Sequence, residues 1–170
     1  MLFAEGKASA AVPYYRRVVA LDKERKSEGT VVWDSLGLAL AQRDAGQAAE
    51  AGETLRDVRA GLEKATNGPA PDPADWIALG ALEAISGERV KAEACLKKVR
   101  PAELKNANTL CDLAEFYALL GRPGPAVETL KKSLAAGNSD PFFADILPEF
   151  RSIRKNPDFR ALFKLDRKTG

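Results

Sequence analysis

The feature that most constrains this chain is an internal repeat with a period of 34 residues. Self-similarity at such a period indicates a stack of small helical units, because each unit can bury its apolar face only against its neighbours. We therefore predict repeats over residues 75–104 and 108–138. Three pairs of anchor residues share the offset of 34: Trp76 and Leu110, Gly87 and Gly121, and Ala92 and Ala126.

A looser copy of the repeat covers residues 30–66 and begins near Trp33. The interval from Trp33 to Ala51 is 18 residues, two longer than the equivalent interval in the next repeat, so an insertion is expected near residues 43–45. Three prolines follow within residues 69–73 and cannot continue a helix, so residues 67–74 are expected to form a loop. Asp75 is then expected to cap the next helix.

Composition agrees with a helical fold. The 170 residues are 45% hydrophobic and 7% aromatic, and the residue types that favour strands are sparse. The length suits one continuous domain built from several repeats. We therefore expect an all-α protein. Gly87 and Gly121 fall between the two helices of their repeats, where a positive φ is useful in a turn.

The repeat resembles the tetratricopeptide repeat family, whose signature is W-x₂-L-G-x₂-Y followed by A-x₃-F over about 34 residues. The resemblance implies a right-handed α-solenoid of antiparallel helical hairpins. The motif residues are packing residues, so the likeness indicates a fold and carries little information on function. The matching positions are Trp76, Leu79, Gly80, Ala92 and Leu96 in one repeat, and Leu110, Leu113, Ala114, Tyr117, Ala126 and Leu130 in the next.

The two ends of the chain differ from the central repeats. Residues 1–22 match only the second helix of a repeat, so the chain is expected to begin inside one. The uncovered side of helix 7–22 is then apolar, and homodimerisation through it is expected as one outcome. Residues 139–170 are rich in Phe, Ile and Leu and are expected to form a pair of capping helices. The Asp140-Pro141 and Asn156-Pro157 pairs are typical of helix starts.

The resemblance also implies a concave groove lined by the first helix of each repeat. The groove positions are mostly small and apolar with a few acids, which suits either an amphipathic helix or a peptide with apolar anchors, to which a basic residue could be added. An equally weighted alternative is that Ile77, Ala81 and Ala84 belong to the core between helices. The candidate partner-binding residues are Asp34, Leu38, Ile77, Ala81, Ala84, Cys111, Asp112 and Glu115.

Residues that would support chemistry are scarce. The chain has no His, and its two cysteines, Cys95 and Cys111, lie too far apart in sequence for a C-x-x-C pair. We expect no catalytic residues, no cofactor and no metal site. A net charge of +2, from 26 basic and 24 acidic residues, argues against nucleic acid as a partner. The chain has no apolar run long enough for a membrane span, so a soluble protein is expected, with the cytoplasm favoured as its compartment.

These patterns favour a non-enzymatic protein-protein interaction module that binds a peptide or partner protein in its groove. Two alternatives stay open. The chain could be the C-terminal regulatory tail of a larger bacterial multidomain enzyme, such as a Ser/Thr kinase or a sulfatase-like protein. It could instead be a scaffold that associates with itself.

Overall fold

The computed structural model describes residues 8–25, 28–138 and 147–164, and these residues form helices, turns and loops without any strand. The prediction of an all-α protein is confirmed. The helices are α1 (Ala8–Arg25), α2 (Glu28–Asp44), α3 (Ala48–Thr66), α4 (Pro73–Ser86), α5 (Arg89–Leu96), η1 (Pro101–Glu103), α6 (Ala107–Leu119), α7 (Pro123–Ala135), η2 (Pro148–Ile153) and α9 (Pro157–Lys164).

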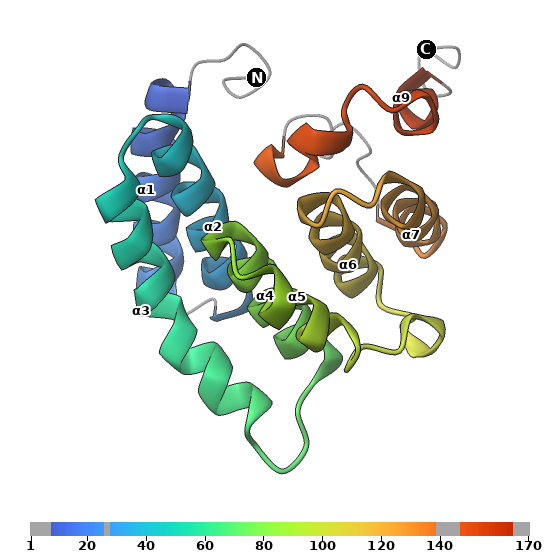
Figure 1. Cartoon of the computed structure of the whole chain (residues 1–170), viewed down its shortest axis with the longest axis horizontal. Helices are drawn as coiled ribbons and strands as arrows, with labels where there is room; N and C mark the ends of the chain where they lie inside the picture. The colour runs from blue at the N-terminus through green and yellow to red at the C-terminus, as the bar shows by residue number, and fades with distance from the viewer. Residues whose placement is uncertain (1–7, 26–27, 139–146, 165–170) are drawn as a thin grey trace.

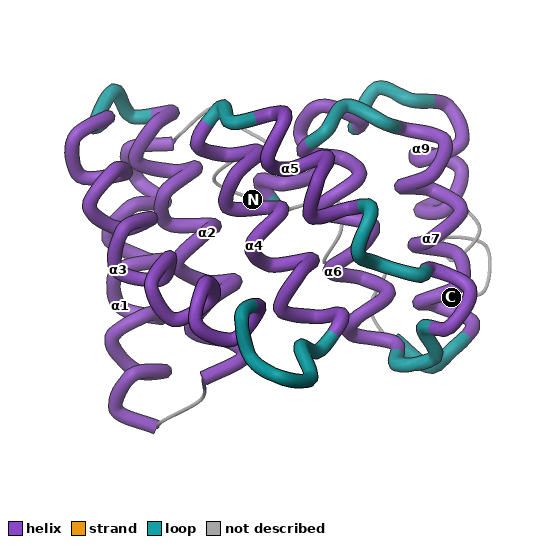
Figure 2. The backbone as a smooth tube through the Cα atoms, turned by 60° about the horizontal axis from the view of Figure 1, so that its bottom comes forward, coloured by secondary structure: helices purple, strands orange, loops and turns teal. Residues whose placement is uncertain are grey.

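Most α-helices that follow one another in sequence pack side by side (Figure 1). α1 packs on α2, α2 on α3, α3 on α4, α4 on α5 and α6 on α7. Contacts of α4 with both α2 and α6 join these helices into a central row. Figure 2 shows the helices standing beside one another, with α1 and α3 at one edge and α7 and α9 at the other.

The same turn closes four of the helices. Gly46, Gly87, Gly121 and Gly137 all have positive φ, between 69° and 104°. At each turn the glycine N–H donates to the carbonyl three residues earlier, and the next N–H donates to the carbonyl five residues before it, at 2.8–3.1 Å. These two bonds define the Schellman motif, which needs a left-handed residue that glycine adopts without strain. At Gly46, Gly87 and Gly121 this local motif connects two described helices.

Two other glycines permit close helix packing. A Cβ placed on Gly80 of α4 would lie 2.3 Å from Cζ of Phe116 in α6, and one on Gly37 of α2 would lie 2.7 Å from Cε1 of Tyr15 in α1. Both glycines occupy the same position of the sequence repeat, four residues after its tryptophan. An aromatic ring from a neighbouring helix therefore fills the space that a side chain would need.

The apolar interior is divided into three packed clusters. The largest joins α2 to α6 around Leu36, Ile77, Leu82, Leu113 and Phe116. A second joins α6 and α7 to the C-terminal elements through Phe150 and Phe159. The third holds α1 against α2. Neighbouring clusters share a helix, α2 or α6, so apolar surface is buried along the whole row of helices.

α4 begins earlier than the sequence predicted. The predicted loop over residues 67–74 is shorter, because Pro73 occupies the first turn of α4 and Asp72 is its cap. The Asp72 carboxylate accepts from the N–H of Ala74 at 2.8 Å, and Asp75 accepts from the N–H of Asp72. Asp75, the expected cap, instead completes this capping box from inside the helix. A proline is compatible with the first helical turn, where its missing N–H is not needed.

The C-terminal elements contact two different parts of the molecule. Asn156 caps α9 by accepting from the N–H groups of Asp158 and Phe159, so the helix start predicted at Asn156-Pro157 is confirmed. α9 packs on α7, as a terminal cap would, but η2 packs on both α6 and α2. Arg151 pairs with Asp44 at the end of α2 at 2.5 Å. The Asp140-Pro141 pair lies outside the described residues.

Candidate functional site

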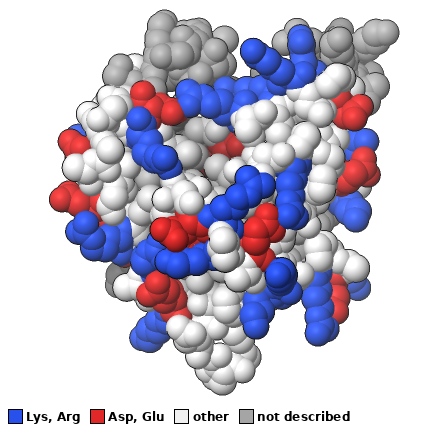
Figure 3. Space-filling view, in the orientation of Figure 1, with Lys and Arg blue, Asp and Glu red and all other residues white. Residues whose placement is uncertain are grey.

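A large cavity of about 1200 Å³ opens where one set of helix ends meets. It is surrounded by the N-terminal parts of α2, α4 and α6 and the C-terminal parts of α3 and α7, and α1 and η2 contribute to its sides. Figure 3 shows a hollow in the upper middle of the molecule with acidic atoms at its bottom. Its apolar walls include Val31, Val58, Leu62, Ala78, Leu130 and Leu134.

Half of the predicted groove residues line this cavity. They are Asp34 from α2, with Cys111, Asp112 and Glu115 from α6. Ile77 and Ala81 are fully buried in the main core, Leu38 is buried against α1, and Ala84 packs on the main core. Ile77, Ala81 and Ala84 therefore belong to the core between helices, which was the alternative to a place in the groove.

The central position of α4 explains why Ile77, Ala81 and Ala84 lie in the core while the predicted residues of α6 line the cavity. The helix contacts α2, α3, α5 and α6, so neighbours cover most of its circumference. It offers only its first turns to the cavity, through Ala74, Asp75 and Ala78. Sequence offsets alone could not indicate how much of the helix its neighbours cover.

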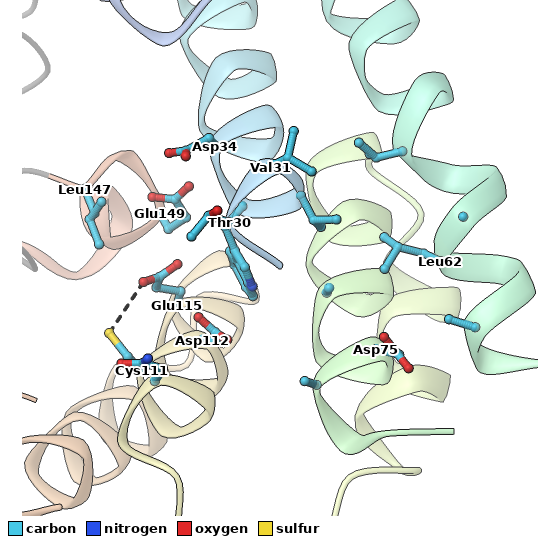
Figure 4. A pocket seen from close by; sticks show the side chains of 18 of the residues that line it. Thr30, Val31, Asp34, Leu62, Asp75, Cys111, Asp112, Glu115, Leu147 and Glu149 are labelled. Atoms are coloured by element: carbon cyan, nitrogen blue, oxygen red, sulfur yellow. Dashed lines mark hydrogen bonds between the residues drawn. The ribbon is translucent and has the colours of Figure 1, made fainter. Parts of the chain in front are cut away.

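Four carboxyl groups converge at one end of the cavity, and we refer to Asp34, Asp112, Glu115 and Glu149 as the acidic cluster. They come from α2, α6 and η2. Figure 4 shows the side chain of Glu149 lying between those of Asp34 and Glu115, with Asp112 beside them. Glu115 is only 6% exposed and Glu149 only 4%, so two of the four are withdrawn from water.

Burial is the main cause of raised pKa values in the acidic cluster. It raises the pKa of Asp34, Asp112 and Glu149 to about 7 each, and the pKa of Glu115 well above its usual range. A hydrogen bond with Asp22 adds to the shift at Asp34, and nearby carboxylates add to those at Glu115 and Glu149. Low dielectric and like charge both disfavour the ionised form.

Glu149 is the functional candidate that sequence reasoning missed. Its Oε2 atom is buried and has no hydrogen-bond partner among the described residues. The attraction of Arg154 opposes the rise in the pKa of Glu149 but does not cancel it. The one available signal was an acid inside the apolar segment that includes Leu147 and Phe150. That signal could not reveal that η2 crosses to α2.

Cys111 faces the same cluster without the properties of a nucleophile. Its Sγ donates to Oε1 of Glu115 at 3.5 Å. Burial, with the charge of Glu115 next in importance, raises the pKa of the Cys111 thiol, so the thiol stays protonated. The thiol acts as a weak hydrogen-bond donor in the cavity wall.

Two further ion pairs hold the helices together outside the cavity. Arg59 of α3 forms a bidentate pair with the buried Glu83 of α4. Arg122 donates from Nη2 to both carboxylate oxygens of Glu93 at 2.7 Å, which ties α5 to the start of α7. These carboxylates are already paired, so they are structural rather than free to bind a ligand.

Within residues 8–25, 28–138 and 147–164, no group of three or more Cys, Asp or Glu side chains is arranged to hold a metal ion. In the same part of the chain, no helix is both long and apolar enough to cross a membrane.

Fold and cavity together define an all-α protein with an acidic cavity where its helix ends meet. Compared with known proteins, the chain matches no family model, no curated protein and no solved structure. Its function is therefore inferred from the residues of the cavity.

Proposed function

We propose that this protein is a protein-interaction module that holds a peptide segment of a partner in the cavity. The single observation that carries the proposal is the cavity itself, which combines apolar walls with a buried acidic end. Its volume of about 1200 Å³ exceeds the range of about 300–1000 Å³ usual for small-molecule sites. An extended or helical peptide segment fills such a space with alternating apolar and polar side chains.

We further propose that the helices form a right-handed solenoid of the tetratricopeptide type. The recurring Schellman turns at Gly46, Gly87 and Gly121 support this, because each joins the two helices of one expected hairpin. The equivalent close contacts at Gly37 and Gly80 support it as well. In such an arrangement the row of α2, α4 and α6 forms the binding side.

A pair of glycines in α3 allows a matched test. Gly61 lines the cavity, and nine residues earlier Gly52 lies half a turn away around the helix. Both are exposed, and a Cβ on either would meet no atom within 4 Å. Glutamine at either position is therefore compatible with folding, and it removes the glycine penalty of about 0.5–1 kcal/mol in a helix.

Peptides selected from a displayed random library would be labelled, and their affinity measured by fluorescence anisotropy. We expect Gly61→Gln to weaken binding by about tenfold or more, because the side chain enters the cavity, whereas Gly52→Gln leaves affinity unchanged. Circular dichroism checks that both variants stay folded. Equal affinity of the two variants, or a library without binders, would contradict the proposal.

Self-association is a second candidate because one face of α1 is uncovered. Tyr14 is 62% exposed and Leu21 36%, and their separation of seven residues places them on the same side of the helix. The opposite side, with Val12 and Val19, packs against α2. A second copy of the chain could cover the Tyr14 face.

A further inference from the structure

We infer that the acidic cluster is a recognition site for one basic side chain, arginine or lysine, of the bound polypeptide. This inference rests on the proposed function and makes it specific. It assigns the cluster to a cation with a long apolar stem, and it names Glu149 as the principal acceptor.

The charge of the cavity favours a cation. Six acidic side chains line it, against two basic ones, Lys23 and Lys64. Neither lysine forms an ion pair with a cluster carboxyl in the described part of the chain. Arg154 offsets part of this charge at Glu149, yet a positively charged group entering the cavity still meets more acidic than basic side chains.

The buried oxygen of Glu149 points to a ligand independently of the charge. Oε2 lies out of contact with solvent and has no hydrogen-bond partner among the described residues. A buried acceptor left unpaired is unfavourable, and native proteins rarely keep one without a purpose. Figure 4 shows this side chain directed at the space between Asp34 and Glu115. A donor placed there would satisfy Glu149 and reach both neighbours.

The chemistry of the cluster matches a guanidinium or an ammonium group. Ionised carboxylates only accept hydrogen bonds, whereas arginine and lysine side chains only donate them. Among the described residues these side chains are not arranged to hold a metal ion, so a group whose donors spread over several directions suits the acceptors of the three elements better. Arginine presents five N–H donors in a planar fork.

The surroundings of the cluster also fit the stem of a basic side chain. Val31 of α2 and Leu147 beside η2 line the cavity near the carboxyl groups (Figure 4). Arginine and lysine carry three or four methylene groups, which pack along apolar surface while the charged end reaches its partners. A free inorganic cation would leave these walls without contacts.

Binding of a cation should depend on pH. The raised pKa values mean that part of the empty cluster carries protons near neutral pH, and a cation favours the ionised form. Other weakly acidic or acidic groups that face the cluster or line the cavity are Tyr15, Asp22, Asp57, Asp75 and Cys111. The basic ones are Lys23, Lys64 and Arg154. A bound cation lowers the pKa values of the acidic cluster, so binding should release protons and tighten as pH rises.

The test uses the full chain and Nα-acetyl-arginine amide as the probe, with titration followed by NMR. The matched probe is Nα-acetyl-citrulline amide, which has nearly the same shape and no charge. We expect the citrulline probe to bind about tenfold more weakly or worse. Affinity for the arginine probe should rise about tenfold between about pH 5.5 and pH 8, with proton release on binding seen by calorimetry.

Two variants with the same change of charge locate the site. Glu149→Gln should weaken the arginine probe by about tenfold or more, because it removes the central acceptor charge. Glu53→Gln, on an exposed part of α3 away from the cavity, should leave binding unchanged. Thermal denaturation checks folding. We expect the melting temperature of Glu149→Gln to be no lower than that of the unaltered chain, because the substitution removes one of several buried like charges.

A further comparison separates a peptide side chain from a free polyamine. We expect acetyl-leucyl-arginine amide to bind more tightly than spermidine, since the apolar walls contact the leucine. Tighter binding of spermidine would overturn the assignment to a polypeptide.

Failure of this inference differs from failure of the proposed function. Equal binding of the arginine and citrulline probes, or an unchanged affinity in Glu149→Gln, would overturn the inference. The proposed function would then still be supported if Gly61→Gln weakened the binding of the library peptides. Conversely, an arginine probe bound at the cluster, with no library peptide bound at all, would overturn the proposed function.

Discussion

Single residues without side chains set the spacing between helices in this protein. Gly80 lets α4 approach α6 until the ring of Phe116 covers its Cα, and Phe116 is itself fully buried. Glycine is a poor helix former, so its place in the middle of α4 is explained by packing and not by local preference.

We expect Gly80→Ala to destabilise the protein by about 1–3 kcal/mol, although alanine is the better helix former, because the new methyl group overlaps a buried ring. Gly61→Ala should have the opposite effect and raise stability by about 0.5–1 kcal/mol, since a Cβ there meets no atom within 4 Å. Urea denaturation followed by circular dichroism measures both changes. Equal stability of Gly80→Ala and the unaltered chain would show that the helices move apart easily.

Individual elements differ in how completely their neighbours cover them. α4 is enclosed, and η2 is held to two helices: Arg151 pairs with Asp44 of α2, and the Oγ of Ser152 donates to the carbonyl of Ala118 in α6 at 2.6 Å. α1, in contrast, lies at the edge of the molecule in Figures 1 and 2 and keeps Tyr14 and Leu21 in solvent. An apolar side chain at such an edge favours association with a second copy.

If α1 mediates self-association, sedimentation velocity at widely separated concentrations will show a species that grows with concentration. Tyr14→Glu should abolish it, because a charge cannot be buried unpaired in an apolar contact. Val90→Glu is the matched control, since Val90 is 85% exposed on α5 and lies on another element. A single sedimenting species at every concentration would count against this role of α1.

At the scale of the whole molecule, the acidic cluster ties stability to pH. Folding brings together carboxyl groups from α2, α6 and η2, and burial raises their pKa values to about 7, from ordinary values of 3.8 for Asp and 4.5 for Glu. The folded chain then binds more protons than the unfolded chain between these limits. The stabilisation is complete below about pH 4 and is lost as pH rises through 7.

The melting temperature should therefore be higher at about pH 5.5 than at about pH 8, by roughly 5 °C or more. Glu149→Gln should reduce this difference, because it removes one of the buried titrating groups, whereas Glu53→Gln should preserve it. Thermal denaturation by circular dichroism at a series of pH values provides the measurement. A melting temperature that rises from about pH 5.5 to pH 8 would refute the burial of these carboxyl groups.

Local chemistry along the sequence was enough to predict an all-α chain and several of its turns and caps. Turn glycines such as Gly87 and Gly121, and the cap at Asn156, act within a few residues of their own position, so their roles follow from the neighbouring sequence. The start of α4 was missed because a proline signals both a loop and a first helical turn. Only the capping bonds of Asp72 distinguish the two.

The binding site was decided by tertiary structure. The resemblance to tetratricopeptide repeats implied a common groove for Asp34, Cys111, Asp112 and Glu115, but it left open whether neighbours bury Ile77 and Ala81. It gave no sign that Glu149 joins Asp34, because that contact requires η2 to reach α2, where Arg151 meets a residue 107 positions away. Helix period and turn chemistry are local properties of the chain, whereas burial, and the pKa shifts it causes, depend on which distant segments pack together.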